Sequence, residues 1–327
     1  MYHSHLLINI GDNPDRPDWN ITRKWLRNLY RVHQRLCMAF PSRSMLHEPH
    51  EQRVAAYCAP YGGAGPHDRN LPGEDDPGVL PCDAPVHSER SGEAGFLFRI
   101  DQPVDQERGV RRPVIVVQSG GDQPPDWDLA FGLDPDRRDD LGRPVGNASH
   151  LLAAPPQCRK VSFTLEGDAL RLSRADRHDG SFTVQPGDRV RFRLRANPVC
   201  RRDGKRKRPQ IAPSEFNAGG QRRERAFIKA HEDWLIRRLG DAAEDVECFI
   251  RDPAVERIET LVTGWAWGWR TKHEPQPSQR MQWWAALFEG TFKVRDPASL
   301  KSLLESGIGP GKAFGFGLLS VAPVAGG

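Results

Sequence analysis

The most regular pattern of hydrophobic and polar positions lies between Arg189 and Ala196, where four arginines alternate with apolar residues. In an extended strand the arginines project from one face, and the apolar side chains pack beneath it. Asn197-Pro198 is expected to end this strand. A basic loop follows, and its cations are Arg201, Arg202, Lys205, Arg206, Lys207 and Arg208. A row of like charges is tolerated best when it is solvated or faces a polyanion, so this stretch indicates a surface.

The rest of the chain carries both helical and strand-like patterns. Apolar stripes with a period of about 3.6 residues predict helices at 22–40, 222–239 and 296–306, the last capped by Asp296. Runs of β-branched, aromatic and alternating residues predict strands at 3–10, 96–100, 113–119, 161–172, 181–184, 246–251, 258–269 and 283–294. The third helix is followed by a glycine-rich loop and a final strand.

This loop contains five glycines, which require unusual backbone dihedral angles or the close approach of another chain: Gly307, Gly309, Gly311, Gly315 and Gly317. A dinucleotide-binding loop follows a strand and precedes a helix, whereas this loop does the reverse. A nucleotide-binding phosphate loop needs Ser or Thr after its lysine, whereas Ala313 follows Lys312. The order of helix, glycine loop and strand suits the last step of a ferredoxin-like β-α-β-β-α-β unit. Backbone amides and Lys312 can then meet a phosphodiester.

Two stretches, 43–93 and 120–155, lack periodicity apart from a weak helical pattern around Trp127 to Phe131, and we interpret them as loop insertions. The first contains residues of the types that bind zinc: His47, His50, Cys58, His67, Cys82 and His87. These residues lack the paired C-x-x-C spacing of zinc sites. We therefore predict no metal site and no cofactor.

Positive charge is concentrated in one part of the chain. Residues 188–229 contain fourteen Lys and Arg against four Asp and Glu, a net charge of +10, whereas the whole chain carries +4. A concentrated basic patch is the electrostatic footprint of a nucleic-acid-binding protein. The alternative is an amphipathic strand with a solvated polar face followed by a charged loop, a common arrangement that implies no polyanion.

The length of 327 residues leaves room for two domains. The chain has no run of about 18 apolar residues and no signal-peptide pattern, which predicts a cytoplasmic protein. Its six cysteines include no C-x-x-C pair, so reduced thiols are favoured over a disulfide framework.

Four segments resemble the CRISPR repeat-processing endoribonuclease of subtype I-E systems, the CasE family of the RAMP superfamily. They are the opening MYHSHLLIN, the helix LYRVHQRLCMAFP, the strand RFRLRANPV with GKR soon after, and the ending GIGPGKAFGFGLLSVAP. The ending is a long match and the most specific one, and the segments have the order and placement found in the family. Residues 43–93 and 120–155 look enlarged relative to the family pattern.

The resemblance implies an α+β fold with two tandem ferredoxin-like (RRM-like) domains and loop insertions. We expect an N-terminal domain at 1–198, which carries the catalytic helix and the insertion at 43–93, and a C-terminal domain at 199–327. The family binds the repeat hairpin of CRISPR precursor RNA and cuts it once at the 3′ base without a metal ion. It retains the mature crRNA as a subunit of the Cascade surveillance complex, so RNA and the other Cascade subunits are the implied partners.

The resemblance also implies the site residues. Tyr30 and His33 match the catalytic Y-x-x-H of the family, and Lys312 lies in its glycine loop. An imidazole with a pKa near 6.5 can act as base for a 2′-OH or as acid for the leaving 5′-oxygen. A phenol can orient the hydroxyl, and a lysine can stabilise charge on the phosphorane. The implied RNA-binding residues are Arg201, Arg202, Lys205, Arg206, Lys207, Arg208, Gly307, Gly309, Gly311, Lys312, Gly315 and Gly317.

Other interpretations remain open. By spacing alone, Tyr30 and His33 simply lie at the edge of a helix that packs on a sheet. The protein would then be a non-catalytic RNA-binding subunit of the same complex. The alternating arginines can be partly structural and join the two domains through acidic partners. A generic single-stranded RNA binder that uses Trp265, Trp267 and Trp269 is disfavoured, because the aromatic and basic features lie in separate segments.

Overall fold

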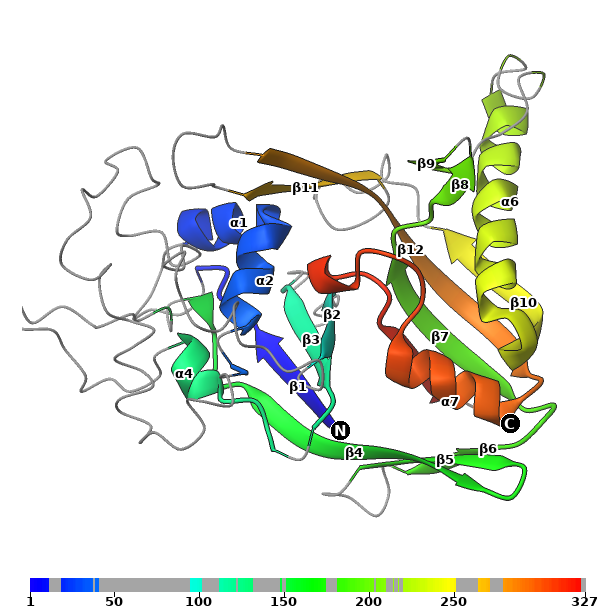
Figure 1. Ribbon diagram of the computed structural model, residues 1–327, viewed down its shortest axis with the longest axis horizontal. Helices are drawn as coiled ribbons and strands as arrows, with labels where there is room; N and C mark the ends of the chain where they lie inside the picture. Colours follow the sequence, from blue (N-terminus) through cyan, green and yellow to red (C-terminus); the bar gives the residue numbers. More distant parts are fainter. Residues whose placement is uncertain are drawn as a thin grey trace, which may run out of the picture. The chain divides into compact units, whose positions relative to one another are not determined.

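The strands of the computed structural model form sheets in two units, which are defined by their internal contacts (Figure 1). The first unit consists of Met1–Phe96, Ile100–Cys158 and Trp267–Met281, and the second of Leu97–Arg99, Arg159–Ala266 and Gln282–Gly327. The structure describes residues 1–11, 19–37, 39–40, 95–101, 112–121, 123–131, 148, 151–174, 181–202, 204–209, 214, 217, 220–250, 264–270 and 279–324.

The N-terminal elements follow the order β-α-β-β-α-β. They are β1 (Tyr2–Leu7), α1 (Trp19–Arg27), α2 (Leu29–Cys37), β2 (Phe96–Asp101), β3 (Val114–Ser119), α4 (Trp127–Phe131) and β4 (Gln157–Glu166). Their strands lie in the order β2-β3-β1-β4. β1 and β3 are antiparallel, and Leu6 lies opposite Ile115. This strand order is that of a ferredoxin-like fold.

The second unit repeats the same plan. Its elements are β7 (Arg189–Ala196), α6 (Gly220–Leu239), β10 (Ala243–Ile250), β12 (Gln279–Val294), α7 (Pro297–Ser306) and β13 (Leu319–Pro323). The strands lie in the order β10-β12-β7-β13, and β11 (Gly264–Arg270) also pairs with β12. The short strands β5 (Ala169–Arg174) and β6 (Phe182–Val184) continue from β4. The predicted α+β class with two ferredoxin-like folds is therefore confirmed.

The arginine strand β7 belongs to the second fold. It pairs with β12 on one side and with β13 on the other, and Leu194 lies opposite both Phe288 and Leu319. The predicted division at residues 198 and 199 places this strand in the N-terminal domain, whereas the unit that contains it begins at Arg159 within β4. The alternation of residues specifies a strand but not its partners, which lie far along the sequence, so the division predicted from the sequence differs from that of the compact units.

Two predicted elements are each divided in the structure. The helix predicted at 22–40 is interrupted at Asn28, whose N–H donates to the carbonyl of Trp25, 3.0 Å away and only three residues back. The strand predicted at 161–172 is a hairpin of β4 and β5, because Gly167 has a φ of 62° and Glu166 pairs with Ala169. Both breaks occur at residue types that favour turns.

Asp296 caps α7 as the sequence predicts. Its carboxylate accepts hydrogen bonds from the Ser299 hydroxyl (2.5 Å) and from the backbone N–H groups of Ser299 (3.0 Å) and Ala298 (3.1 Å). The Ser299 hydroxyl, followed by these two N–H groups, holds the pKa of Asp296 below its ordinary value of 3.8. The helix ends at Gly307, whose N–H donates to the carbonyl of Leu303.

We expect Asp296→Ala to lower the thermal unfolding temperature at neutral pH, with a difference from the wild type that shrinks in acid. The pKa of Asp296 is lower in the folded than in the unfolded protein. Its carboxylate therefore stabilises the fold at pH values above the unfolded-state pKa. This contribution is lost as the pH falls through the folded pKa. Thermal unfolding at neutral pH and below pH 3.8 measures it. Glu305→Ala, at the other end of α7, is the control, and a difference for Asp296→Ala that is constant with pH would contradict the capping role.

Candidate nucleic-acid interface and catalytic residues

The position of Tyr30 and His33 follows from the apolar stripe of α2. Leu29, Val32 and Leu36 are at most 2% exposed, and they fix the helix against the core of the first unit. Tyr30 and His33 lie one turn apart beside this stripe, and both are partly exposed. The helix therefore presents a phenol and an imidazole at the boundary between core and solvent.

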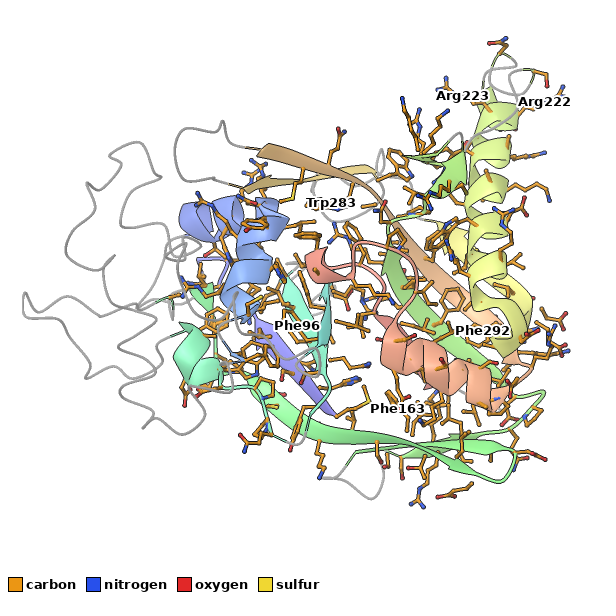
Figure 2. The ribbon with its side chains drawn as sticks, viewed as in Figure 1. Phe96, Phe163, Arg222, Arg223, Trp283 and Phe292 are labelled. Atoms are coloured by element: carbon orange, nitrogen blue, oxygen red, sulfur yellow. The ribbon has the colours of Figure 1, made fainter. Side chains whose placement is uncertain are left out.

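The imidazole of His33 has two neighbours in the first unit that sequence reasoning missed. The ring of Phe96, labelled in Figure 2, stacks on it with centroids 5.9 Å apart and planes inclined by 25°. The Sγ of Cys37, which is buried, lies 3.5 Å from Nε2 and 3.6 Å from Nδ1 of His33. Cys37 follows His33 by four residues, so helical spacing could have predicted this contact. Both contacts restrict the ring, which an acid or base catalyst requires.

The glycine loop adopts the unusual dihedral angles that the sequence predicts. All five glycines have φ between 72° and 91°. A Cβ at Gly317 would lie 2.8 Å from the carbonyl oxygen of Ile308, and one at Gly307 would lie 2.8 Å from Leu97 Cδ1. Gly317 also donates its N–H to the carbonyl of Arg195 (2.7 Å) and accepts from the N–H of Ile308 (2.8 Å). The close approach therefore comes from this chain itself.

Lys312 begins a short 3₁₀ turn, Lys312–Phe314, between Gly311 and Gly315. The N–H of Phe314 donates to the carbonyl of Gly311 (2.8 Å). The ring centroids of Phe314 and Trp283 lie 4.4 Å apart, and Trp283 is labelled in Figure 2. The turn is thus held by a backbone hydrogen bond and a ring contact, and Lys312 remains partly exposed.

The predicted basic loop is a β-hairpin. β8 (Cys200–Arg202) and β9 (Lys205–Lys207) are antiparallel, with Arg201 opposite Arg206 and Arg202 opposite Lys205. The sequence Asp203-Gly204 is typical of a two-residue hairpin turn, a signal that the prediction of a loop overlooked. The side chains of Arg201, Lys205 and Arg208 are exposed, whereas those of Arg202 and Arg206 lie outside the described residues. Cations on paired strands repel one another, so this hairpin favours a polyanion.

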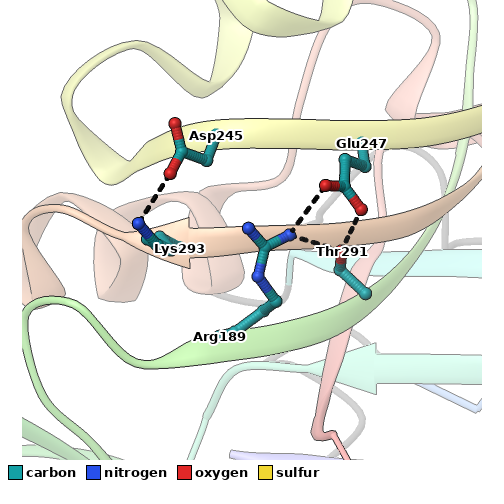
Figure 3. A network of polar contacts seen from close by, with 5 residues as sticks. All are labelled: Arg189, Asp245, Glu247, Thr291 and Lys293. Atoms are coloured by element: carbon teal, nitrogen blue, oxygen red, sulfur yellow. Dashed lines mark hydrogen bonds and ion pairs between the residues drawn. The ribbon is translucent and has the colours of Figure 1, made fainter.

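Two of the four arginines of β7 have acidic partners within their own sheet, whereas Arg195 does not lie on the surface as predicted but is fully buried, with its guanidinium carbon 5.0 Å from the ring centroid of Phe316. Arg193 forms an ion pair with Glu289 of β12. Arg189 donates to the Thr291 hydroxyl (2.9 Å) and lies 3.5 Å from the carboxylate of Glu247, in the network that Figure 3 shows. These acidic partners agree with a partly structural row, but they come from strands of the same sheet and unit, so these pairs do not join the two domains. The charge of the row is therefore already balanced in part by the fold.

Arg99 of β2 is a buried cation that the sequence pattern did not reveal. It is 3% exposed, and its Nη1 lies 3.0 Å from the carbonyl of Arg193, 2.8 Å from that of Leu318 and 3.1 Å from the Ser320 hydroxyl. All four residues belong to the second unit. Arg99 thus holds β7 and the start of β13 together, where the glycine loop ends.

Several predicted residues lie outside the described part of the chain. They include the candidate zinc ligands of residues 43–93 and the side chains of Trp265, Trp267 and Trp269, although strand β11 itself is present. Within the described residues, no group of three or more His, Cys, Asp or Glu could hold a metal ion. The four cysteines described, at 37, 158, 200 and 248, are free thiols. Among the helices described, none has the length and apolar character needed to cross a membrane.

A family model described as CRISPR associated protein matches residues 80–323. The chain belongs to the CRISPR-associated protein family. This match covers the second ferredoxin-like fold as described, from β7 to β13, together with the basic hairpin and the glycine loop. Tyr30 and His33 precede it.

Two relatives of this CRISPR-associated protein support the resemblance to the CasE family. The CRISPR-associated endoribonuclease Cse3 of Thermus thermophilus is 36% identical over 141 residues, which are 43% of this chain and 58% of the relative. The Cascade subunit CasE of Escherichia coli K12 is 34% identical over 148 residues, 44% of this chain and 62% of the relative. The chain thus spans less than two thirds of the length of either relative.

Solved structures of relatives also align with this CRISPR-associated protein. Cse3 bound to a 19-nucleotide RNA has 24% identity and a TM-score of 0.49, over 99% of this chain and 100% of that one. Cas6e from Escherichia coli K-12 has 21% identity and a TM-score of 0.39, with the same coverage. The ferredoxin-like assignment rests on the strand orders described above.

Proposed function

We propose that this protein is a metal-independent endoribonuclease of the cytoplasm that cleaves CRISPR precursor RNA at the 3′ base of the repeat hairpin. It then retains the mature crRNA as a subunit of the Cascade complex. The observation that carries the proposal is the family membership, joined to a relative named CRISPR-associated endoribonuclease and another named Cascade subunit. The Y-x-x-H of α2 and the basic hairpin are residue types that suit this activity.

The proposed reaction uses the nucleophile that RNA itself carries. The 2′-OH attacks the adjacent phosphorus, the bond to the 5′-oxygen breaks, and the products are a 2′,3′-cyclic phosphate and a 5′-OH. His33 accepts the proton of the 2′-OH or donates one to the leaving oxygen. Tyr30 orients the attacking hydroxyl, and Lys312 stabilises the charge of the phosphorane. Tyr30 and His33 belong to the first unit and Lys312 to the second, so their union in one site is part of the proposal.

RNA binding is assigned to the basic hairpin and the glycine loop. The exposed cations of the hairpin contact the backbone of the RNA stem, and the backbone N–H groups of the loop, with Lys312, contact phosphate. Paired acidic residues leave the arginines of β7 a smaller share in this binding. The partners are therefore the repeat hairpin, the mature crRNA and the other Cascade subunits.

The test is incubation of the purified protein with its cognate repeat RNA in EDTA, with ribose or 2′-deoxyribose at the scissile position. We expect cleavage of the ribose substrate, a cyclic phosphate at the new 3′ end, and no cleavage of the deoxy substrate. Tight binding of intact RNA would instead identify a non-catalytic RNA-binding subunit. Cleavage that requires a divalent metal would overturn the mechanism.

Removing one hairpin cation is expected to lower the salt dependence of RNA binding. For Lys205→Ala, the slope of log affinity against log salt concentration should fall by about one unit, since one phosphate contact is lost. Fluorescence anisotropy at several salt concentrations measures this slope. Arg171→Ala is the control, because this exposed cation of β5 is already paired with Glu166 at 3.3 Å. Equal slopes for Lys205→Ala and Arg171→Ala would remove the hairpin from the interface.

A further inference from the structure

Arg208, directly after β9, rests on an aromatic ring. Its guanidinium carbon lies 5.2 Å from the ring centroid of Trp284 in β12. Arg208 is exposed, whereas Trp284 is 9% exposed. A guanidinium over an indole is attracted by the ring, and its N–H groups, which lie in its own plane, stay available to donate hydrogen bonds. The ring therefore acts as a platform for Arg208 at the base of the hairpin.

The Trp284 ring is held at its N–H edge by His231 of α6. This imidazole is fully buried, and its Nδ1 donates to the carbonyl of Phe227, 2.8 Å away, because a carbonyl can only accept. Its Nε2 is then an acceptor and receives the indole N–H of Trp284 at 2.8 Å. Burial, and to a smaller degree the charge of Arg208, lowers the pKa of His231 below 6.5 against the opposing effect of the Phe227 carbonyl. Nε2 thus remains an acceptor at neutral pH.

The first strand of the hairpin is also anchored to α6, at the same end as Arg208, because Cys200 pairs with Lys207. The indole N–H of Trp234 donates to the carbonyl of Val199, 3.2 Å away and just before β8. Cys200 packs against the core of the second unit, and Pro209 is buried. Both strands of the hairpin are therefore held at its base, next to Arg208, so the direction of Arg208 is set by the Trp284 ring and not by movement of the strands.

We propose that His231 and Trp284 are positioning residues that orient Arg208 towards the RNA backbone before RNA binds. This inference rests on the proposed function. An ordered cation loses less conformational entropy on binding than a free one, so the affinity gained through Arg208 depends on the hydrogen bond between His231 and Trp284. The chemical partner is a phosphate oxygen of the RNA stem.

The decisive experiment is a double-mutant cycle on repeat-RNA affinity. We expect His231→Leu to weaken binding about three- to tenfold by releasing the ring and Arg208. In the background of Arg208→Ala the same change should have little further effect, whereas in the background of Arg201→Ala it should keep its full effect. His231→Gln, whose amide oxygen can accept the indole N–H, should restore binding to within about twofold of the wild type. Additive effects of His231→Leu and Arg208→Ala would overturn the inference.

A second measurement does not depend on RNA. The Nε–Hε signal of Arg208, assigned by its loss in Arg208→Ala, should be more mobile on the nanosecond timescale in His231→Leu than in the wild type. If His231→Leu does not fold, Trp284→Phe replaces it, because it keeps a ring under Arg208 without the N–H. Failure of the wild type to bind repeat RNA would contradict the proposed function and the assigned phosphate partner, but not the ordering of Arg208 by His231 and Trp284. In that case, equal mobility of Arg208 in His231→Leu and in the wild type would contradict this ordering, and greater mobility in His231→Leu would support it.

Discussion

Replacing His33 by alanine is expected to lower the rate of RNA cleavage by about 10²- to 10⁴-fold, which is the usual contribution of a positioned acid or base catalyst. The residual rate should reflect binding and charge stabilisation by the remaining groups. RNA affinity should change little, since the proposed contacts to the stem come from the hairpin and the glycine loop. Single-turnover cleavage at saturating protein separates the chemical step from binding and product release.

A second histidine of the first unit provides the matched control for His33. His5 lies in β1 and is exposed, and His5→Ala should cleave at a rate close to that of the wild type. Phe96→Leu keeps the imidazole but removes the ring that stacks on it. It should lower the rate less than His33→Ala does. Wild-type cleavage by His33→Ala would move the catalyst elsewhere and leave the Y-x-x-H as a structural motif.

Replacing Gly317 by alanine is expected to lower the free energy of unfolding by about 2–4 kcal/mol. Its φ of 91° is strained for any residue with a Cβ, and that atom would lie 2.8 Å from the carbonyl oxygen of Ile308. Relief of the contact would break the hydrogen bonds that Gly317 makes with Ile308 and Arg195. Urea denaturation, followed by tryptophan fluorescence, measures the loss.

Gly187 is the matched control, since it has nearly the same φ without the crowding. Its φ is 92°, and a Cβ there would meet nothing within 4 Å. Gly187→Ala should therefore cost only about 1 kcal/mol, from backbone strain alone. An equal loss for the two variants would mean that the close approach at Gly317 carries no energy. A larger loss for Gly317→Ala assigns the excess to the packing of the loop.

Features that depend on nearby residues could be predicted from the sequence. The alternation of β7, the cap of α7 at Asp296 and the positive φ of the loop glycines each follow from neighbours within a few positions. The helical spacing also places Tyr30 and His33 on one face of α2. Their assignment as catalytic residues came from the family resemblance, because the same spacing suits a helix edge.

Features that depend on distant segments could not be predicted. Nothing near β7 in the sequence specifies β12 and β13 as its neighbours, so local patterns do not show which compact unit contains β7. Arg99 belongs to an apolar strand pattern, yet its hydrogen-bond partners are distant in the sequence. They are Arg193 in β7, Leu318 just before β13 and Ser320 in β13. The contact of Phe96 with His33 likewise joins two segments that are far apart in the chain. The residues around a site thus come from tertiary structure, which local patterns do not encode.

The central place of β7 also governs when the second fold can form during synthesis. β7 leaves the ribosome before both of its hydrogen-bonding partners, first β12 and then β13 (Leu319–Pro323). Until β12 arrives both edges of β7 stay open, and until β13 arrives one of them does. Sheets with such distant pairings fold slowly and expose edges that aggregate. The four arginines place a row of like charges on this open strand, and such charges disfavour pairing of its edges with other copies.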